Sequence, residues 1–206
     1  MNDAAANGVP TGGRSFLGVH DLGASGDPAT SLARISAADL VGTGQESRRS
    51  EILAQLARHG SALAERTNSA GHLTGSALVI DSTGERTLVM LHTKLGRWLQ
   101  PGGHADGDHE LAGVALREAT EETGIAGLRV RVPAIDIDIH AVDHGDDLGE
   151  HLHFDLRFLV VAPPGAREQG NHESQELRWV TLGELEALAD EPSLLRLARR
   201  GFAVGV

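Results

Sequence analysis

The sequence has no cysteine and no tyrosine, and its 206 residues include only four phenylalanines and two tryptophans. Without cysteine, the chain cannot form a disulfide scaffold, a thiolate zinc site or a thiol nucleophile. So few aromatic side chains also leave little for stacking against single-stranded nucleic acid. No hydrophobic run approaches the roughly 18 residues of a membrane span, and the first residues do not have the pattern of a signal peptide. We therefore expect a cytoplasmic protein without membrane attachment.

Basic side chains are also few compared with acidic ones. Lysine and arginine total 18, aspartate and glutamate total 29, and the net charge is −11. Such a chain repels a polyanion, so we expect no nucleic-acid polymer as a partner. A small phosphorylated ligand remains compatible with this charge if metal ions mediate the contact. Hydrophobic residues make up 40% of the chain, which is enough for the core of one domain of about 130–150 residues plus an extension.

The first third of the chain differs from the rest in composition and in the spacing of its apolar residues. Residues 1–30 are rich in small and polar residues without periodicity, which predicts a flexible tail or a segment packed against a partner. Residues 31–69 have apolar residues near helical spacing, with Ser50 as a candidate N-cap, and predict an N-terminal helical extension. A homodimer formed through this N-terminal segment is one role that it could have.

Residues 70–206 read as a single domain that alternates strands and helices. Strict alternation of apolar and polar residues in 135–140 and 151–158 predicts strands. The remaining predicted strands are 78–81, 87–92 and 177–180, and the predicted helices are 108–123, 182–188 and 193–200. The expected fold class is therefore α/β, with a mixed sheet flanked by helices.

One predicted helix carries three carboxylates on one side. At about 100° per residue, Glu118, Glu121 and Glu122 fall within roughly 100° of one another. Asp108 is the expected N-cap of this helix, and Gly124 is the residue expected to end it. Three neighbouring carboxylates repel one another. A divalent cation bound between them would offset that repulsion, and Mg²⁺ suits such a site because it prefers oxygen ligands. A solvated acidic face is the alternative interpretation.

The residues around this helix resemble the Nudix box, the signature of a hydrolase superfamily. The pattern is Gly, five residues, Glu, seven residues, Arg-Glu, an aliphatic residue, any residue, Glu-Glu, any residue, Gly and an aliphatic residue. The matching positions are Gly103, Arg117, Glu118, Glu121, Glu122, Gly124 and Ile125, with Ala119 as a small aliphatic residue. His109 departs from the pattern, because it stands where the first Glu is expected. Residues 98–103 and 176–185 also look Nudix-like, so the resemblance covers about residues 70–190.

The resemblance implies a Nudix-type α/β/α sandwich that hydrolyses a diphosphate bond in a nucleoside diphosphate linked to another group. By the same resemblance, Glu118, Glu121, Glu122 and the backbone carbonyl of Gly103 would bind Mg²⁺ or Mn²⁺. Arg117 would orient the carboxylates through a charge-assisted hydrogen bond. The partner would then be a small phosphorylated compound, most naturally a nucleotide. A Nudix-fold nucleotide-binding or sensor module without hydrolysis is the alternative.

The resemblance leaves the general base open. Glu118 and Glu121 are candidates within the box, and Glu173 has the spacing of a catalytic glutamate on a later loop, although an ordinary surface acid is its other interpretation. His109 is expected to weaken the pairing that fixes the loop to the helix. Glu110 is a possible substitute, although it points about 100° away around the helix.

The two predicted strands with strict alternation carry polar side chains that have more than one interpretation. His151, His153 and Asp155 could form a transition-metal site, but three successive side chains on one face of a strand cannot all reach one ion. His153, Asp155 and Arg157 could instead line a substrate cleft, or the strand could present a plain half-exposed face. The same alternatives apply to the polar face of residues 136–140.

Three further residues precede the Gly-rich stretch. Lys94 and Arg97 could meet phosphates or lie on the surface as ordinary charges, and Trp98 is expected in the core rather than stacked on a base. A phosphate-cradling P-loop is excluded, since no Gly-Lys-Ser/Thr follows the glycines.

Overall fold

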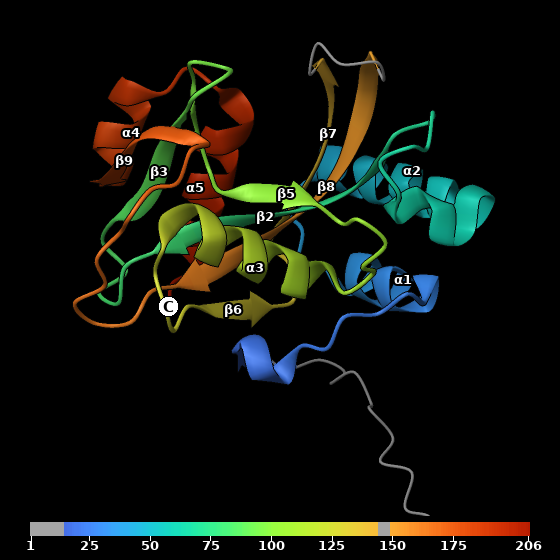
Figure 1. Cartoon of the computed structure of the whole chain (residues 1–206), viewed down its shortest axis with the longest axis horizontal. Coiled ribbons are helices and arrows are strands. Elements are labelled where there is room, and N and C mark those ends of the chain that lie inside the picture. Colours follow the sequence, from blue (N-terminus) through green and yellow to red (C-terminus); the bar gives the residue numbers. More distant parts are fainter. Residues whose placement is uncertain (1–14, 144–148) are drawn as a thin grey trace, which may run out of the picture.

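The computed structural model describes residues 15–143 and 149–206. Within these residues, nine strands form one mixed sheet (Figure 1). The strands are β1 (Ser15–Leu17), β2 (His72–Ile80), β3 (Thr87–His92), β4 (Trp98–Leu99), β5 (Gly102–His104), β6 (Arg129–Val132), β7 (Asp136–Asp143), β8 (Glu150–Val161) and β9 (Ser174–Val180). The helices are α1 (Pro28–Ala37), α2 (Thr43–His59), α3 (Leu111–Thr123), α4 (Leu182–Leu188) and α5 (Pro192–Val204), with short 3₁₀ turns at Val19–Asp21 and Gly60–Ala64.

The parallel pair of β2 and β8 forms the centre of the sheet. The sheet runs in the order β1-β6-β8-β2-β3-β4, with β5 beside β2, β7 beside β8 and β9 beside β3. All nine residues of β2 are buried, as expected for a strand that is covered on both faces. Alternate residues of β2 therefore pack into two hydrophobic cores, one on each face of the sheet. Leu73, Ala77 and Val79 belong to the core with α3, and Leu78 and Ile80 belong to the core with α4 and α5. The predicted α/β/α sandwich is confirmed.

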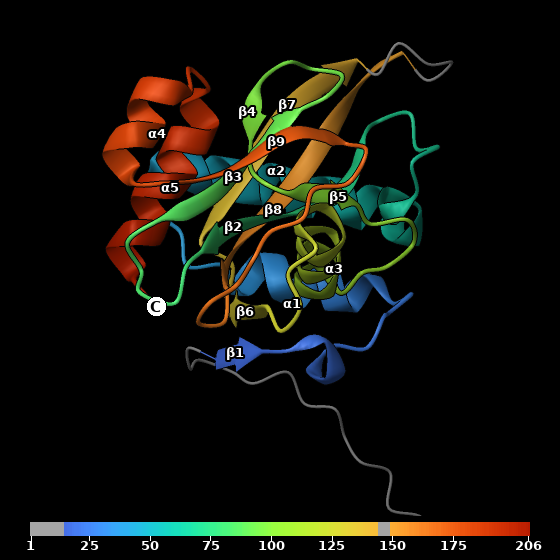
Figure 2. The same ribbon diagram turned by 60° about the vertical axis from the view of Figure 1, so that its left-hand side comes forward.

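The N-terminal helices belong to the core on the α3 side (Figures 1 and 2). Ile35 of α1 and Ile52 and Leu56 of α2 are all buried there. The predicted N-terminal helical extension is thus present, but its second helix begins earlier than expected. Gly42, not Ser50, is the N-cap of α2, and the Ser50 hydroxyl donates to the carbonyl of Glu46 inside the helix.

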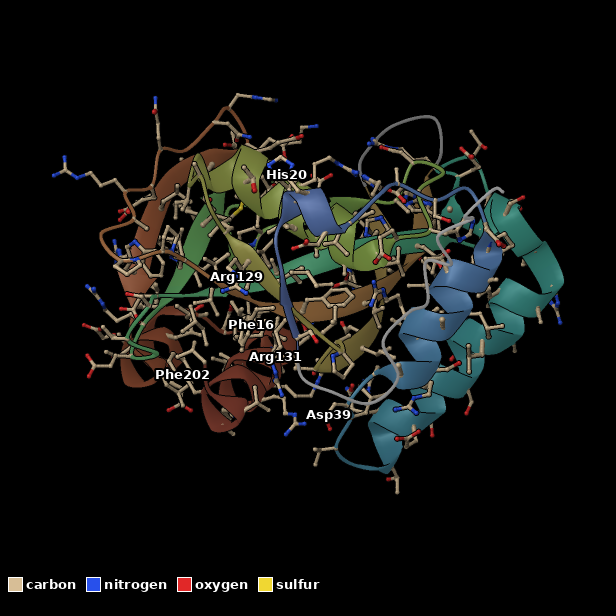
Figure 3. The ribbon with its side chains drawn as sticks, turned by 90° about the horizontal axis from the view of Figure 1, so that it is seen from below. Phe16, His20, Asp39, Arg129, Arg131 and Phe202 are labelled. Atoms are coloured by element: carbon tan, nitrogen blue, oxygen red, sulfur yellow. The ribbon has the colours of Figure 1, made fainter. Side chains whose placement is uncertain are left out.

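Residues 15–17 extend the sheet at one edge. In β1, which pairs antiparallel with β6, Phe16 lies opposite Arg131. The guanidinium of Arg129 lies 5.7 Å from the Phe16 ring centroid and donates to the Phe16 carbonyl at 2.9 Å (Figure 3). This part of the predicted tail packs against its own chain, and residues 1–14 lie outside the described residues.

The division of the chain into 1–30, 31–69 and 70–206 stays a prediction, as does the homodimer. The described part of the N-terminal segment covers this chain's own sheet edge and core. No helix in the described ranges has both the length and the apolar character needed to cross a membrane.

Most elements predicted in the second part of the chain are found. Strand 87–92 and helix 182–188 have the predicted bounds, and the other predicted strands extend further or shift by a residue at an end. The strands β1, β4, β5 and β6 were not predicted. Each has four residues or fewer, which is too short for alternation to give a signal.

Candidate active site

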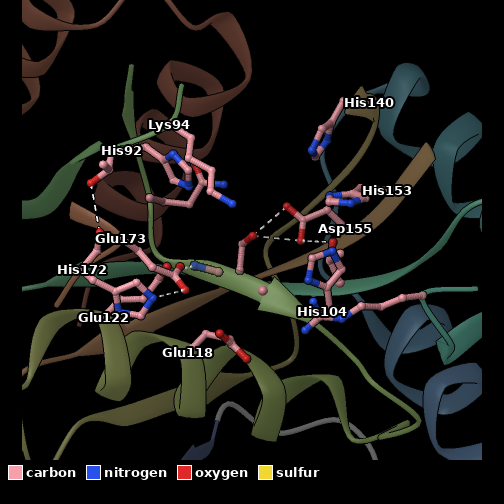
Figure 4. A pocket seen from close by; sticks show the side chains of 17 residues that line it. His92, Lys94, His104, Glu118, Glu122, His140, His153, Asp155, His172 and Glu173 are labelled. Carbon is pink, nitrogen blue, oxygen red and sulfur yellow. Dashed lines mark hydrogen bonds and ion pairs between the residues drawn. The ribbon is translucent and has the colours of Figure 1, made fainter. Parts of the chain in front are cut away.

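A cleft of about 400 Å³ opens between α3, β5 and the sheet (Figure 4). One wall carries carboxylates from α3 and from the loop before β9, and the other carries imidazoles and polar side chains from β2, β5, β7 and β8. The lining residues are Arg66, Thr74, Ser76, His92, Thr93, Lys94, Gln100, Gly102, Gly103, His104, Glu118, Glu122, His140, His153, Asp155, His172 and Glu173.

Helix α3 holds the carboxylate wall in place, and its start differs from the expected one. Its N-cap is Glu110, whose side chain accepts from the N–H of Ala112. Asp108, the expected N-cap, lies before the helix, where it accepts from the N–H groups of Ser25 and Glu110. The predicted end is confirmed: Gly124 has φ 65°, the left-handed conformation that favours glycine.

Glu118 and Glu122, one helical turn apart, both face the cleft. Glu122 is only 4% exposed and accepts from the N–H of Gly102 at 2.9 Å. Glu118 accepts from Arg117 Nη2 at 3.1 Å, and the same nitrogen donates to the carbonyl of His104 at 3.2 Å. Arg117 therefore ties the helix to β5 and contacts Glu118; its role in orienting the carboxylates stays a prediction.

Burial shifts the protonation of these two carboxyl groups. Desolvation raises the pKa of Glu122 to about 8. The hydrogen bond from the Gly102 N–H opposes this shift, whereas a hydrogen bond with Glu173 and the charge of Glu173 add to it. Desolvation also raises the pKa of Glu118, partly offset by Arg117 and reinforced by the charges of Glu121 and Glu173. Carboxylates brought together in this way are poorly stable as anions unless a cation joins them.

Glu173 reaches the cleft because its loop is tied to the end of α3. The Gln169 N–H donates to the carbonyl of Thr123 at 2.7 Å, and the side chain of Asn171 donates to the carbonyl of Glu121 while accepting from the N–H of Glu173. The structure thus brings Glu173 to Glu118 and Glu122, as its spacing suggested.

Glu121 occupies a different position from its two neighbours in the box. Its side chain is exposed and does not line the cleft, although its charge contributes to the raised pKa of Glu118. Gly103 of β5 does line the cleft, directly opposite Glu118.

His109, the residue that departs from the box, packs against the N-terminal extension. The His109 ring is buried, and its Nδ1 lies 2.8 Å from the hydroxyl of Ser31 in α1. Glu110 is held by Arg34 of α1 in a buried pair of hydrogen bonds, each 2.8 Å. Glu110 is therefore not available as a substitute in the site. Asp108 instead faces Arg117, at 3.7 Å from Nη1, and this contact helps to fix the loop to the helix.

The sheet wall of the cleft is buried and polar, so a half-exposed face on β8 was the wrong interpretation. Asp155 is 1% exposed and accepts from Thr74 and Ser76, the neighbouring residues of β2. It also accepts from Arg157 at 2.7 Å. His153 and Asp155 line the cleft, whereas Arg157 lies behind them.

The polar face of β7 joins the same network. Asp138 accepts from Arg157 and from Arg196 of α5, and Arg196 also binds Asp136. These two arginines, with His140, hold the pKa of the Asp138 carboxyl well below its usual range despite burial. The network links β7 and β8 to α5. Most of this face is therefore structural, and only His140 of β7 lines the cleft.

The three residues before the Gly-rich stretch have different roles. Lys94 lines the cleft, whereas Arg97 pairs with Glu191 at 3.5 Å. Trp98 packs against the core formed with α4 and α5, as expected, and the Arg178 guanidinium lies 4.9 Å from its ring centroid.

Sequence reasoning missed much of the sheet wall. His72 and His104 gave no periodic signal, because one begins a strand that was predicted to start at residue 78 and the other lies in the unpredicted β5. Desolvation, together with the charges of neighbouring histidines, depresses the pKa of His153 far below its usual range, so this ring is neutral at physiological pH. A high count of 11 histidines was the one available hint.

A family model described as NUDIX domain matches residues 72–200, more than half of the chain. The chain therefore belongs to the NUDIX family.

Solved structures with the same fold resemble the chain at low sequence identity. A NUDIX family hydrolase from Clostridium perfringens has a TM-score of 0.50 at 19% identity, over 65% of this chain and 97% of that one. The Ap4A hydrolase of C. elegans has a TM-score of 0.50 at 19% identity, over 64% and 96%. The E. coli dihydroneopterin triphosphate pyrophosphohydrolase has a TM-score of 0.51 at 14% identity, over 62% and 92%. Among curated proteins, none matches this chain.

Proposed function

We propose that this protein hydrolyses a diphosphate bond in a nucleoside diphosphate that is linked to another group, and that it requires Mg²⁺ or Mn²⁺. The observation that supports this most directly is the convergence of Glu118, Glu122 and Glu173 on one cleft beside Gly103. A NUDIX family chain with this carboxylate set has the ligands that such a reaction needs.

The carboxylate wall fits a divalent cation on chemical grounds. Glu122 is buried, hydrogen-bonded to Glu173 and protonated near neutral pH when no cation is present. A hard divalent ion would replace that proton, because Mg²⁺ and Mn²⁺ bind carboxylate and carbonyl oxygens. Glu118, Glu122 and the carbonyl of Gly103 would hold the ion, with Glu121 completing the set from the exposed rim.

The bound ion would screen the negative charge of the diphosphate and make a water molecule more acidic. The side chains supply the remaining chemistry. Arg117 fixes the orientation of Glu118, and Glu173 takes a proton from the attacking water. Glu118 and Glu121 are the other candidate bases. Lys94 extends into the cleft as a cation for a substrate phosphate.

The size of the cleft and the net charge of the chain support the proposed substrate class. A volume of about 400 Å³ suits a small molecule, and the net charge of −11 disfavours a nucleic-acid polymer. A small phosphorylated compound, most naturally a nucleotide, is the proposed partner, and the cytoplasm is the proposed location.

Chromatography of the products formed from a panel of compounds tests the proposal, because cleavage of their diphosphate bonds gives nucleotides, other phosphomonoesters or pyrophosphate. The panel contains nucleoside triphosphates, ADP-ribose, nucleotide sugars, NADH and dinucleoside polyphosphates, the last because one similar structure is named an Ap4A hydrolase. Each compound is incubated with Mg²⁺ and then Mn²⁺, with Glu122→Gln as the blank. Metal-dependent turnover that the variant lacks supports hydrolysis. Nucleotide binding by calorimetry without turnover supports the alternative, a nucleotide-binding or sensor module.

A further inference from the structure

Three imidazoles converge on the sheet wall of the cleft, from three different strands. His72 begins β2, His104 ends β5 and His153 lies on β8. In the parallel pairing of β2 with β8, His72 is directly opposite His153, and β5 lies along the other side of β2. One ligand nitrogen from each ring lies within 4.8 Å of the other two. Figure 4 shows His104 and His153 on the side of the cleft opposite Lys94 and Glu173.

The rings are packed against one another rather than spread over the surface. The centroid distances are 4.9 Å for His72–His104, 4.8 Å for His72–His153 and 5.0 Å for His104–His153. His72 is 1% exposed and His153 is 9% exposed. The buried carboxylate of Asp155, two residues from His153 on β8, is engaged by Thr74, Ser76 and Arg157. The metal ligands that the cluster offers are nitrogens.

We propose that His72, His104 and His153 form a second metal site, which takes a borderline-soft transition ion such as Zn²⁺. Three imidazoles are a known protein ligand set for zinc, with Zn–N distances of about 2.0–2.1 Å. Tetrahedral geometry at that bond length separates two nitrogens by roughly 3.4 Å. The most distant pair here must therefore close by up to about 1.4 Å, which rotation of the rings can supply. Mg²⁺ is disfavoured, because it prefers oxygen ligands.

An ion in this site would face the substrate. His104 and His153 both line the cleft, so the fourth position of a tetrahedral ion would point toward it and accept a water or a substrate oxygen. The site is distinct from the carboxylate wall, although His104 follows Gly103 directly in β5. Two ions of different chemical preference would then occupy opposite walls of one cleft.

Metal binding by the full, untagged chain tests this site. The protein is stripped with a chelator, dialysed against excess Mg²⁺ to fill the carboxylates, and titrated with Zn²⁺. Co²⁺ serves as a spectroscopic probe, since four-coordinate Co²⁺ absorbs visible light far more strongly than six-coordinate Co²⁺. We expect one tightly bound Zn²⁺ and the strong Co²⁺ absorption.

The variants separate the two walls. His104→Ala, at a half-buried position, and His153→Gln, a conservative change, should each lose the Zn²⁺ and the Co²⁺ absorption. His172→Ala is the matched control, since it removes a histidine that lines the same cleft outside the cluster. It should bind as the parent does, and so should Glu122→Gln. Circular dichroism and thermal unfolding in chelator confirm that each variant is folded.

Two results would overturn the assignment. One is a parent protein that retains no Zn²⁺ under these conditions, which would make the cluster a group of packed rings without a metal. The other is Zn²⁺ binding that persists in folded His104→Ala but disappears in Glu122→Gln, which would place the ion at the carboxylates. Neither result depends on turnover, so the hydrolase proposal and the histidine site succeed or fail separately.

Discussion

Gly103 and Glu118 approach each other so closely that the glycine has no room for a side chain. A methyl group on Gly103 would lie 2.4 Å from Oε2 of Glu118 and 2.5 Å from its Cδ. Real Cβ contacts are not that short, so any side chain at position 103 must displace the carboxylate. The strand that would supply a carbonyl to the metal therefore also limits the position of Glu118, one of the proposed carboxylate ligands.

Gly103→Ala should consequently weaken metal binding while the fold is retained. We expect the Kd for Mn²⁺ to rise about 10–100-fold, the usual effect of disturbing the groups that orient a ligand. Isothermal titration calorimetry measures this. Gly183→Ala is the control, because nothing lies within 4 Å of its added Cβ. Unchanged Mn²⁺ affinity in a folded Gly103→Ala would show that Glu118 is not a ligand.

The three box glutamates should differ in importance. Glu122→Gln and Glu118→Gln remove carboxylates that line the cleft, and each should abolish measurable Mn²⁺ binding and turnover. Glu121→Gln changes an exposed side chain outside the cleft lining, so its effect should be at least tenfold smaller. Calorimetry and initial rates on the three variants compare them directly. Equal losses in all three would mean that Glu121 turns inward when metal binds.

Binding of the cation should release a proton from Glu122. Because burial raises its pKa to about 8, the metal-free carboxyl is protonated at pH 6.5 to 7.5 and must lose its proton to bind an ion. The Kd for Mn²⁺ should fall by up to about tenfold per pH unit until pH 8 and level off above it. Calorimetry in buffers of different ionisation enthalpy measures the released proton. A Kd that is independent of pH over this range would contradict the raised pKa.

Glu122 should also make the metal-free protein lose stability as the pH rises from about 4.5 to about 8. Its folded pKa lies above the ordinary value of 4.5, so the folded state holds a proton that the unfolded state has lost. The free energy of unfolding contributed by Glu122 is fully present below pH 4.5 and is lost as pH rises to about 8. Urea titrations in chelator should show this decline. Glu122→Gln, which cannot ionise, should flatten it.

Glu173 should affect turnover more than metal affinity. Its loop is fixed to α3 through Asn171, and its carboxylate lies beside Glu122 on the same wall of the cleft. If it removes the proton from water, Glu173→Gln should lower kcat by about 10²–10⁴-fold and change KM little. Glu176→Gln is the control, an exposed acid three residues away that does not line the cleft. A kcat close to the parent value would transfer the role of base to Glu118 or Glu121.

The carboxylate wall could be predicted because its residues are local in sequence. Helical spacing alone places Glu118 and Glu122 on one side of α3, and Gly124 ends the helix where the sequence says it should. Glu173 required the resemblance to a family as well, since no local pattern places a loop beside a helix 50 residues earlier. The long alternating strands were predicted for the same local reason as the helix.

The sheet wall could not be predicted, because it depends on strand register. His72 meets His153 only through a parallel pairing between residues 81 positions apart. For the polar residues of β8, the alternation left both a cleft lining and a half-exposed face open, and the structure buries Asp155 and Arg157 against partners from β2 and β7. Buried polar networks give the same alternation as a half-exposed strand, and only tertiary structure distinguishes the two.

The N-terminal extension should be required for stability through one buried ion pair. Arg34 of α1 and Glu110, the N-cap of α3, have side chains only 9% and 8% exposed and share two hydrogen bonds of 2.8 Å. Removing one partner leaves a buried charge alone, so Arg34→Ala should lower the free energy of unfolding by about 3–5 kcal/mol. Arg199→Ala breaks the exposed pair with Glu186 and should cost about 0–1 kcal/mol.

Urea denaturation followed by circular dichroism compares these variants. The double variant Arg34→Met with Glu110→Gln removes both charges and should recover part of the loss, because no unpaired carboxylate then remains buried. If Arg34→Ala is no less stable than Arg199→Ala, α1 is not coupled to α3 in solution. In that case the pairing of His109 with Ser31 could not compensate for the missing glutamate of the box.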